Sequence, residues 1–233
     1  LGVSYRDSGL SLGVAPVMNF ASLSTITARN PDGSDRVIDD AGRLAEGRMF
    51  VDDATDQQLG MVVGLRYDGP DGLAFGLTWQ REVLYQLKGQ GRLTLGTAEE
   101  TVIDARIDLP MAQAIRYGLD WTVSPRWVIR PTISWIEWSL MERQKAVNLS
   151  NGDSLMDLPR EWSDAWAGRL CVDYLVSEWL RLTVGGVYEL GVTPPRTFDP
   201  GSSESNNWEL AVGGSYQLSP ALRISSSFTW QQF

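Results

Sequence analysis

The stretch AIRYGLDWTVSPRWVIRPTISW (114–135) carries the pattern that decides the fold. Apolar and polar residues alternate on both sides of SPRW (124–127), which has the composition of a tight turn. Before the turn, one face holds Ile115, Tyr117, Leu119, Trp121 and Val123, and after it the same face holds Trp127, Ile129, Ile133 and Trp135. The pattern predicts two antiparallel strands that each have one apolar and one polar face.

The same alternation recurs outward from this hairpin and predicts ten strand-like runs in all. Their connections alternate between short and long. The short ones are 5–11, 67–73, 124–127, 176–179 and 219–221, and the long ones are 27–56, 89–110, 146–163 and 192–207. The chain is therefore expected to run back and forth, with tight turns at one end and long loops at the other.

Aromatic residues bound the apolar face at two levels. Tyr67, Trp121, Trp127, Tyr174, Trp179 and Tyr216 stand at the turn end, and Trp79, Trp135, Tyr188, Trp208 and Trp230 lie further along. This spacing suits tilted strands that cross a hydrocarbon layer of ~25 Å. The polar face carries both signs of charge, which the packed core of a soluble β-sandwich would rarely bury. We therefore predict an all-β fold, an antiparallel transmembrane β-barrel of the bacterial outer membrane with its long loops outside.

Composition narrows the function further. The 233 residues suffice for one domain, and the net charge of −9 argues against a nucleic-acid partner. Histidine is absent, which removes Ser-His-Asp catalysis and most zinc sites. The acids Asp32, Asp35, Asp39, Asp40, Asp52 and Asp53 lack calcium-loop spacing, and Glu161 and Asp164 are interpreted as a solvated loop edge. No enzyme activity, cofactor or metal site is predicted.

Three stretches together resemble one family by their order and spacing. They are 107–139, with a Leu-Pro before an amphipathic hairpin ending in Trp-Ser; 159–195, with Trp and Asp before a strand and a Pro-rich loop after the next; and 206–230, with Gly-Gly-x-Tyr before a tight turn. The chain resembles the FadL-type outer-membrane transporters of long-chain fatty acids and aromatic hydrocarbons. The resemblance covers most of 57–230.

The resemblance implies a fourteen-stranded barrel plugged by a small N-terminal hatch. Residues 1–233 are then expected to form a single barrel domain that supplies about ten strands and lacks the hatch and some terminal strands. The implied function is passive uptake of hydrophobic small molecules. The expected partners are a hydrophobic ligand, outer-membrane lipid and lipopolysaccharide, and the protein is expected to be a monomer.

The predicted lumen face carries the candidate ligand contacts. Arg116 and Arg169 lie mid-strand and could hold a carboxylate with a bidentate guanidinium, although each arginine could instead pair with a lumen acid. Leu84, Ile136 and Trp138 near the outer strand ends are the candidates for contact with an alkyl chain or ring, and Trp138 could equally be a girdle residue. A general or sugar porin and a structural barrel without transport remain alternatives.

Overall fold

The computed structural model describes residues 2–28, 42, 47–94, 99–197 and 205–232. These residues form one antiparallel sheet of fourteen strands and two single-turn 3₁₀ helices, η1 (Trp138–Leu140) and η2 (Pro195–Thr197). None of the helices in the described part of the chain is long and apolar enough to cross a membrane. The strands are β1 (Val3–Asp7), β2 (Leu10–Ala28), β3 (Arg48–Asp68), β4 (Leu73–Gln80), β5 (Val83–Thr94), β6 (Thr101–Met111), β7 (Ala114–Ser124), β8 (Trp127–Ile136), β9 (Arg143–Asn148), β10 (Ser154–Pro159), β11 (Ala165–Leu175), β12 (Leu180–Glu189), β13 (Asn207–Ser219) and β14 (Leu222–Gln232).

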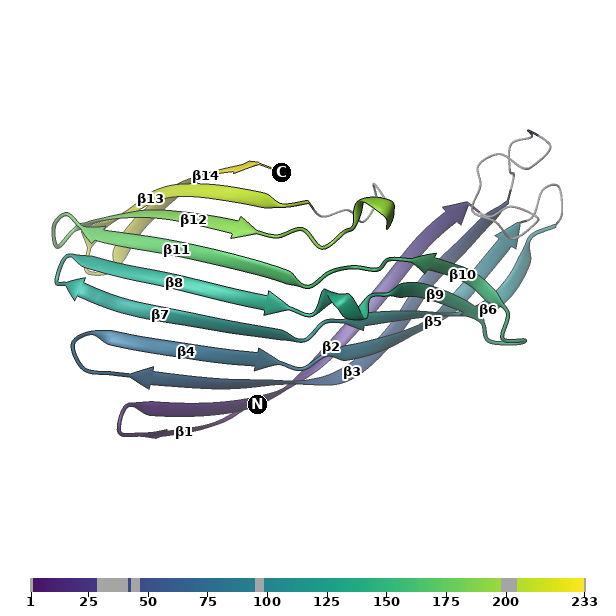
Figure 1. Ribbon diagram of the computed structural model, residues 1–233, viewed down its shortest axis with the longest axis horizontal. Helices are drawn as coiled ribbons and strands as arrows, with labels where there is room; N and C mark the ends of the chain where they lie inside the picture. The colour runs from purple at the N-terminus through teal and green to yellow at the C-terminus, as the bar shows by residue number, and fades with distance from the viewer. Residues whose placement is uncertain (1, 29–41, 43–46, 95–98, 198–204, 233) are drawn as a thin grey trace.

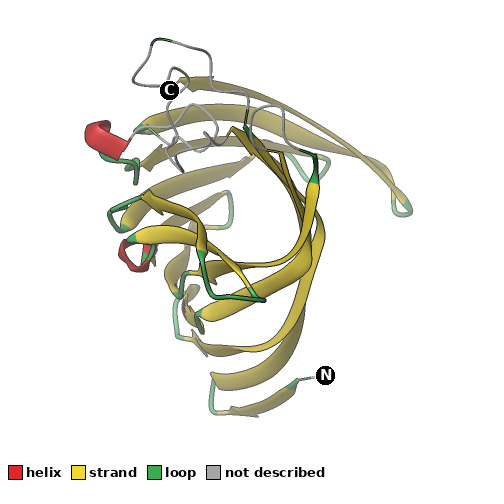
Figure 2. Cartoon of the chain, turned by 90° about the vertical axis from the view of Figure 1, so that its right-hand side faces the viewer, coloured by secondary structure: helices red, strands yellow, loops and turns green. Residues whose placement is uncertain are grey.

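Several of these strands are halves of one pass of the chain. β4 runs on into β5, β6 into β7, β8 into β9, and β10 into β11, each after a short break, whereas the other strands are undivided. The fourteen strands therefore arise from ten passes, as the alternating runs predicted. The sheet curls into an open, C-shaped wall when it is viewed end-on (Figure 2).

Two parts of the sheet meet along the line of breaks. We call β4, β7, β8 and β11–β14, with the adjoining turn-side halves of β2 and β3, the barrel sheet. We call β5, β6, β9 and β10, with the other halves of β2 and β3, the outer sheet. The two parts are continuous because β3 pairs with β4 through Val62–Asp68 and with β5 through residues between Arg48 and Thr55. The outer sheet extends beyond the barrel sheet at an angle (Figure 1).

The expected long loops at 27–56, 89–110 and 146–163 are wrong over much of their length. β3, β5, β6, β9 and β10 continue through these ranges as paired strands of the outer sheet. The physical reason is that apolar side chains of these strands bury one another on one face, which stabilises the paired strands beyond the membrane band. The tight turns at the opposite end lie where the sequence predicted them.

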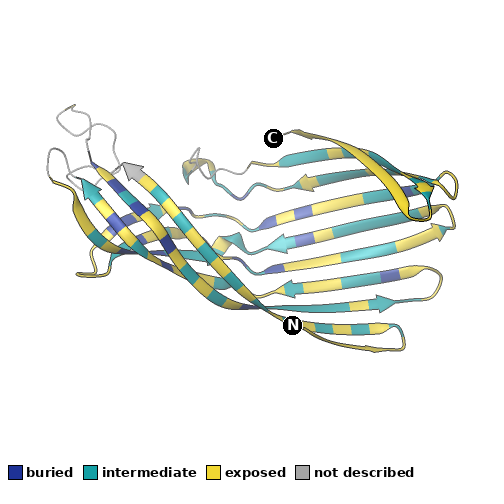
Figure 3. Cartoon of the chain, turned by 180° about the vertical axis from the view of Figure 1, so that it is seen from behind, coloured by how far each residue is buried: buried dark blue, intermediate teal, exposed yellow. Residues whose placement is uncertain are grey.

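The barrel sheet keeps the predicted faces. Directly opposed residues of an antiparallel pair share a face, and the register aligns Ile129, Val172, Val184, Val212 and Phe228 in one outward row. These side chains are half-exposed or exposed, because no protein layer covers them. Figure 3 shows that exposed residues recur along the strands of this sheet.

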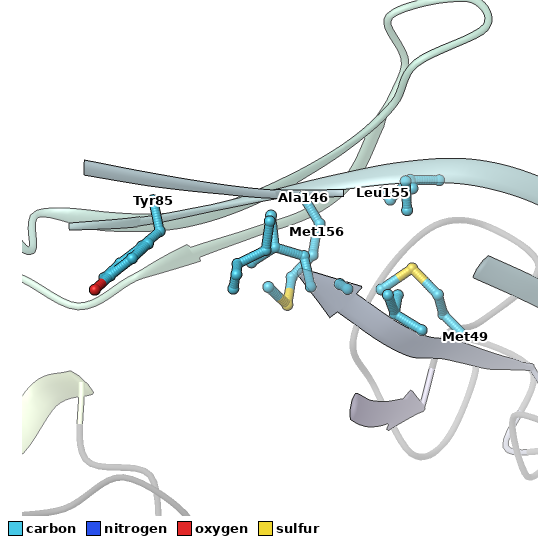
Figure 4. Close-up of a cluster of buried hydrophobic side chains, with 10 residues drawn as sticks. Met49, Tyr85, Ala146, Leu155 and Met156 are labelled. Atoms are coloured by element: carbon cyan, nitrogen blue, oxygen red, sulfur yellow. The ribbon is translucent and has the colours of Figure 1, made fainter. Parts of the chain in front are cut away.

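The outer sheet buries its apolar side chains on the concave face instead. The cluster, which we call the outer cluster, consists of Met49, Val51, Ala54, Tyr85, Leu87, Ala105, Ile107, Ala146, Leu155 and Met156 (Figure 4). Val51 and Leu87 are 0% exposed. Ala54 shares its face of β3 with the inner residues of the barrel sheet, because the pairing with β2 runs without a shift from Tyr67 to Ala54. The outer cluster therefore continues the inner face of the wall.

Candidate functional site

The inner face of the barrel sheet is the candidate site, because it would line the lumen. One of its rows crosses eight strands and mixes charged residues with small ones. In order it contains Ser11, Arg66, Gly76, Gly118, Thr132, Arg169, Val187 and Glu209. Next to it, a hollow of about 420 Å³ lies against Cys171, Thr183, Gly185, Ala211, Gly213 and Ser215. Small side chains on this stretch of wall leave room for a ligand.

Charged side chains form a continuous belt across the turn end of the inner face. Arg66 pairs with Asp68 at 2.8 Å and lies 3.9 Å from Asp120. Arg130 joins Asp120 at 2.7 Å to Asp173 at 2.6 Å. The belt is extended by Arg6, which pairs with Asp68, and by Arg181 and Thr183, which contact Asp173. We call these residues the charge belt. In it, Arg6, Arg66, Arg130 and Arg181 pair with carboxylates, so their charges are already compensated within the protein.

Arg116 and Arg169 lie further from the turns than the charge belt does. Arg116 on β7 is opposite Ser134 on β8, and the Nη1 group of Arg169 donates a 3.0 Å hydrogen bond to the hydroxyl of Ser134. The fold therefore brings the two predicted head-group residues to the same part of the inner face. Arg169 lies 3.9 Å from Glu189, whereas within the described ranges Arg116 is exposed and has no salt bridge. Of the two, Arg116 is the guanidinium with more capacity to take an anion.

Ile136 and Trp138 stand where the barrel sheet meets the outer sheet. Ile136 is opposite Ala114 on β7 and Ala165 on β11, on the same face as Ser134. Trp138 has left the strand for η1, and its ring packs edge-on against Trp162 at 5.5 Å between centroids. The indole N–H of Trp162 is buried and has no hydrogen-bond partner. Ile136 thus lies on the predicted lumen face, while Trp138 belongs to an aromatic pair at the junction.

Leu84 lies on the other face from the one expected. Tyr85 and Leu87 belong to the outer cluster, and Leu84, which alternates with them on β5, is 52% exposed. The break at Arg81 and Glu82 adds one residue to the pass, so the inner face takes even positions on β4 and odd positions on β5. Sequence alternation carried across that break assigns Leu84 to the wrong side.

Polar side chains tie the junction together. Trp79 donates its indole N–H to Gln113 at 2.8 Å, and Gln113 in turn donates to Glu137 at 2.7 Å. Asp164 accepts hydrogen bonds from the indole of Trp135 and from the backbone N–H of Ser139. The two girdle tryptophans are thereby fixed at the strand breaks, and Asp164 is structural rather than one of a catalytic pair.

The remaining acids of interest also have structural partners. Glu161 pairs with Arg196, whereas Asp52 and Asp53 accept hydrogen bonds from Ser24 and Ser22. Asp32, Asp35, Asp39 and Asp40 lie outside the described residues. In the part of the chain that the structure describes, no cluster of three or more potential ligands could hold a metal ion.

Asp56 closes an irregular stretch of the ladder between β3 and β5. Its carboxylate accepts hydrogen bonds from the side chain of Gln58 and from the backbone N–H groups of Gln86 and Gln57. The bond from Gln58 is the largest of the effects that hold the pKa of Asp56 below its ordinary value of 3.8. The side chain thus substitutes for a missing backbone acceptor at the base of the outer sheet.

The outer cluster is the lining that sequence reasoning missed. Its residues face the same side as the lumen residues and pack against one another as a buried cluster at the outer end of the wall. The signal was present in the alternation of Ile103, Ala105 and Ile107 with Asp104 and Arg106, but the range 89–110 was interpreted from its length as a loop. The inner face therefore changes from a charged end to an apolar end.

A family model identifies the architecture. The model of the family described as outer membrane protein transport protein (OMPP1/FadL/TodX) matches residues 10–233. The chain belongs to this family. Membership confirms the resemblance inferred from the sequence, the outer-membrane location and the all-β transmembrane barrel class of this FadL/TodX family member. The family consists of transport proteins, not enzymes.

Solved structures of similar fold are distant in sequence. A FadL homologue from Pseudomonas aeruginosa shares 16% identity with a TM-score of 0.79, and the match covers 99% of this chain and 58% of that protein. The monoaromatic hydrocarbon channel CymD shares 15% identity with a TM-score of 0.73, and the match covers 99% of this chain and 66% of that protein. The toluene transporter TodX of P. putida shares 17% identity with a TM-score of 0.66, and the match covers 98% of this chain and 61% of that protein. The FadL/TodX family member described here therefore spans less than two thirds of the length of each. None of the curated proteins matches its sequence.

Proposed function

We propose that this protein provides a passive route by which hydrophobic small molecules cross the outer membrane. The observation that carries the proposal is the hollow of about 420 Å³ on the inner face, which small side chains leave open next to the charge belt. An apolar ligand would lie there and against Ile136 rather than on the outer cluster, whose side chains are already buried, and burying each methylene of the ligand is worth ~0.8 kcal/mol. Family membership supports the same function, and we expect it to be performed by a monomer.

The ligand would be oriented by the two arginines at Ser134. A long-chain fatty acid would place its carboxylate at Arg116 or Arg169, and its tail would extend past Ile136 toward Trp138. An uncharged aromatic hydrocarbon would use only the apolar part of this path. Leu84 has no place in this path, since it lies on the opposite face of β5 from Tyr85 and Leu87.

Uptake of oleate and toluene by cells that express the full-length protein tests this arrangement. Arg169→Ala should weaken oleate uptake by about fivefold or less, because a partly exposed charge contributes at most ~1 kcal/mol, and should leave toluene uptake unchanged. Trp138→Ala should weaken uptake of both compounds, because it removes apolar surface. Unchanged uptake of both by the Trp138 variant would contradict the proposed path.

The single cysteine supplies an independent readout. Cys171 lies on the inner face, where it borders the 420 Å³ hollow. A membrane-impermeant thiol reagent should label it in intact cells, and oleate should slow the labelling. A general or sugar porin would instead admit maltose in a liposome-swelling assay and show no protection by oleate. A structural barrel without transport would show neither protection nor swelling.

A further inference from the structure

The outward face of the barrel sheet contains a hollow that the proposed transport path does not use. Gly168 and Gly186 lie on this face, opposite Tyr188 and opposite Leu170 and Leu210 respectively. A Cβ atom at Gly168 would meet nothing within 4 Å, and one at Gly186 would meet its nearest neighbours at 3.5 Å. The missing side chains leave a depression of about 580 Å³, which we call the wall groove.

Apolar side chains surround the wall groove. Leu170, Val172, Val184 and Leu210 flank it, and Tyr188 and Trp208 stand at its loop-side end. Trp208 is held edge-on against Trp230, with 4.4 Å between the ring centroids, so this end has a stiff wall. Period-2 alternation turns the side chains of the neighbouring residues Arg169 and Glu209 to the lumen, which leaves mainly backbone as the floor.

The position of the wall groove determines what covers it. It begins at the outer aromatic level of Tyr188 and Trp208 and reaches the middle row of Val172 and Val184. This is the half of the membrane band nearer the long connections, which is the extracellular half in outer-membrane barrels. The surface is continuous with the lipid interface, so hydrocarbon chains of the outer leaflet lie against it. In the bacterial outer membrane that leaflet is lipopolysaccharide.

We propose that the wall groove holds one acyl chain of the lipid A part of lipopolysaccharide. An empty groove would forfeit the dispersion contacts of the atoms that line it. Lipid chains are as apolar as leucine, so the preference comes from shape and packing rather than from the hydrophobic effect. A straight saturated chain can lie along the glycine floor between Leu170 and Leu210, with its end at Trp208. The proposal assigns a lipid contact on the side of the wall opposite the transport path, and it stands independently of transport.

Native mass spectrometry tests the proposal. The full-length protein is placed in phosphatidylcholine nanodiscs with added hexa-acyl lipid A, and the lipid A molecules that stay bound after release are counted. Wild type should retain lipid A. Gly168→Leu and Gly186→Leu should lose it, because the new side chain fills the groove; the open space at Gly168 and the ordinary 3.5 Å contacts at Gly186 allow the substitutions.

Ser226→Leu is the matched control. It adds the same side chain to the outward face of β14, opposite Gly214 and away from the wall groove, and should retain lipid A as wild type does. Circular dichroism establishes that each variant is folded before it is compared. Equal retention by all variants would overturn the proposal. If wild type retained added phosphatidylglycerol as well as it retains lipid A, and both leucine variants lost it, lipid A would be overturned as the source of the chain.

Discussion

The barrel sheet and the outer sheet place their apolar side chains on opposite sides of the same wall. In the barrel sheet, residues such as Val184 and Val212 face outward and are exposed to the bilayer. In the outer sheet, Val51 and Leu87 face inward and are fully buried, while Lys88 and Arg92 face out. The reversal occurs at the strand breaks, beside the outer girdle tryptophans.

The difference shows that the surrounding solvent, not the strand, decides which face is apolar. Below the breaks, hydrocarbon lies outside, and a wet lumen accepts the charge belt. Above them, water lies outside, so the apolar face turns inward and packs as it would in a soluble protein. Adding one residue to a pass is enough to exchange the two faces, because the period of a strand is two.

The largest expected effect is on the outer cluster. Leu87→Ala should lower the free energy of unfolding by about 2–5 kcal/mol, because it leaves a cavity among fully buried side chains. Guanidinium unfolding of the protein in lipid vesicles measures this. Leu182→Ala on the outward face of β12 is the control and should cost clearly less, since lipid fills the space. Equal costs would contradict a packed outer sheet.

The next effect tests the lipid-facing side. Val212 is 55% exposed and lies in the middle row of the outward face. Val212→Arg should destabilise the protein by ~2–4 kcal/mol, the cost of a cation at the bilayer midplane. Ser227→Arg on the inner face of β14 should be tolerated, because the lumen is wet. The same unfolding measurement would refute the assigned sides if the lumen substitution proved the more costly.

The smallest effect is the pH dependence at Asp56. Its pKa is lowered in the folded protein, so its contribution to stability is complete above its unfolded value of 3.8 and is lost as the pH falls through the lower folded value. Asp56→Asn should therefore be less stable than wild type at pH 7, and the difference should shrink below pH 3.8. A difference that does not change between pH 7 and pH 2 would show that the carboxylate charge is immaterial at this break.

Sequence reasoning succeeded where one pattern ran unbroken from turn to girdle. The alternation around the short turns 124–127 and 176–179 predicted the faces of β7, β8, β11 and β12, and on that inner face Arg66, Arg130 and Arg181 pair with lumen acids. Arg116 and Arg169 were placed on one inner face, where the structure brings them to Ser134. Local alternation is sufficient for these features because strand geometry alone determines them.

Sequence reasoning failed where a break between two strands changed which residues of the pass face inward. Leu84 would face the lumen if the alternation of β4 continued into β5. Arg81 and Glu82 lie at the break, and neither residue type indicates that the alternation shifts there by one residue. Trp138 was expected near the outer end of a strand, whereas it lies in η1 after Glu137, and its contact with a ligand stays a prediction. The outer strands were interpreted as loops, because their charged faces and long spacing resemble solvated connections. These errors depend on pairing between distant segments, which a local pattern does not contain.

The reversed polarity of the outer sheet also constrains biogenesis. Lys88, Arg92, Asp104 and Arg106 lie on its solvent face, and none of them could rest against hydrocarbon without a large penalty. During insertion this face therefore has to be kept away from the hydrocarbon while the outer halves of the strands cross the bilayer.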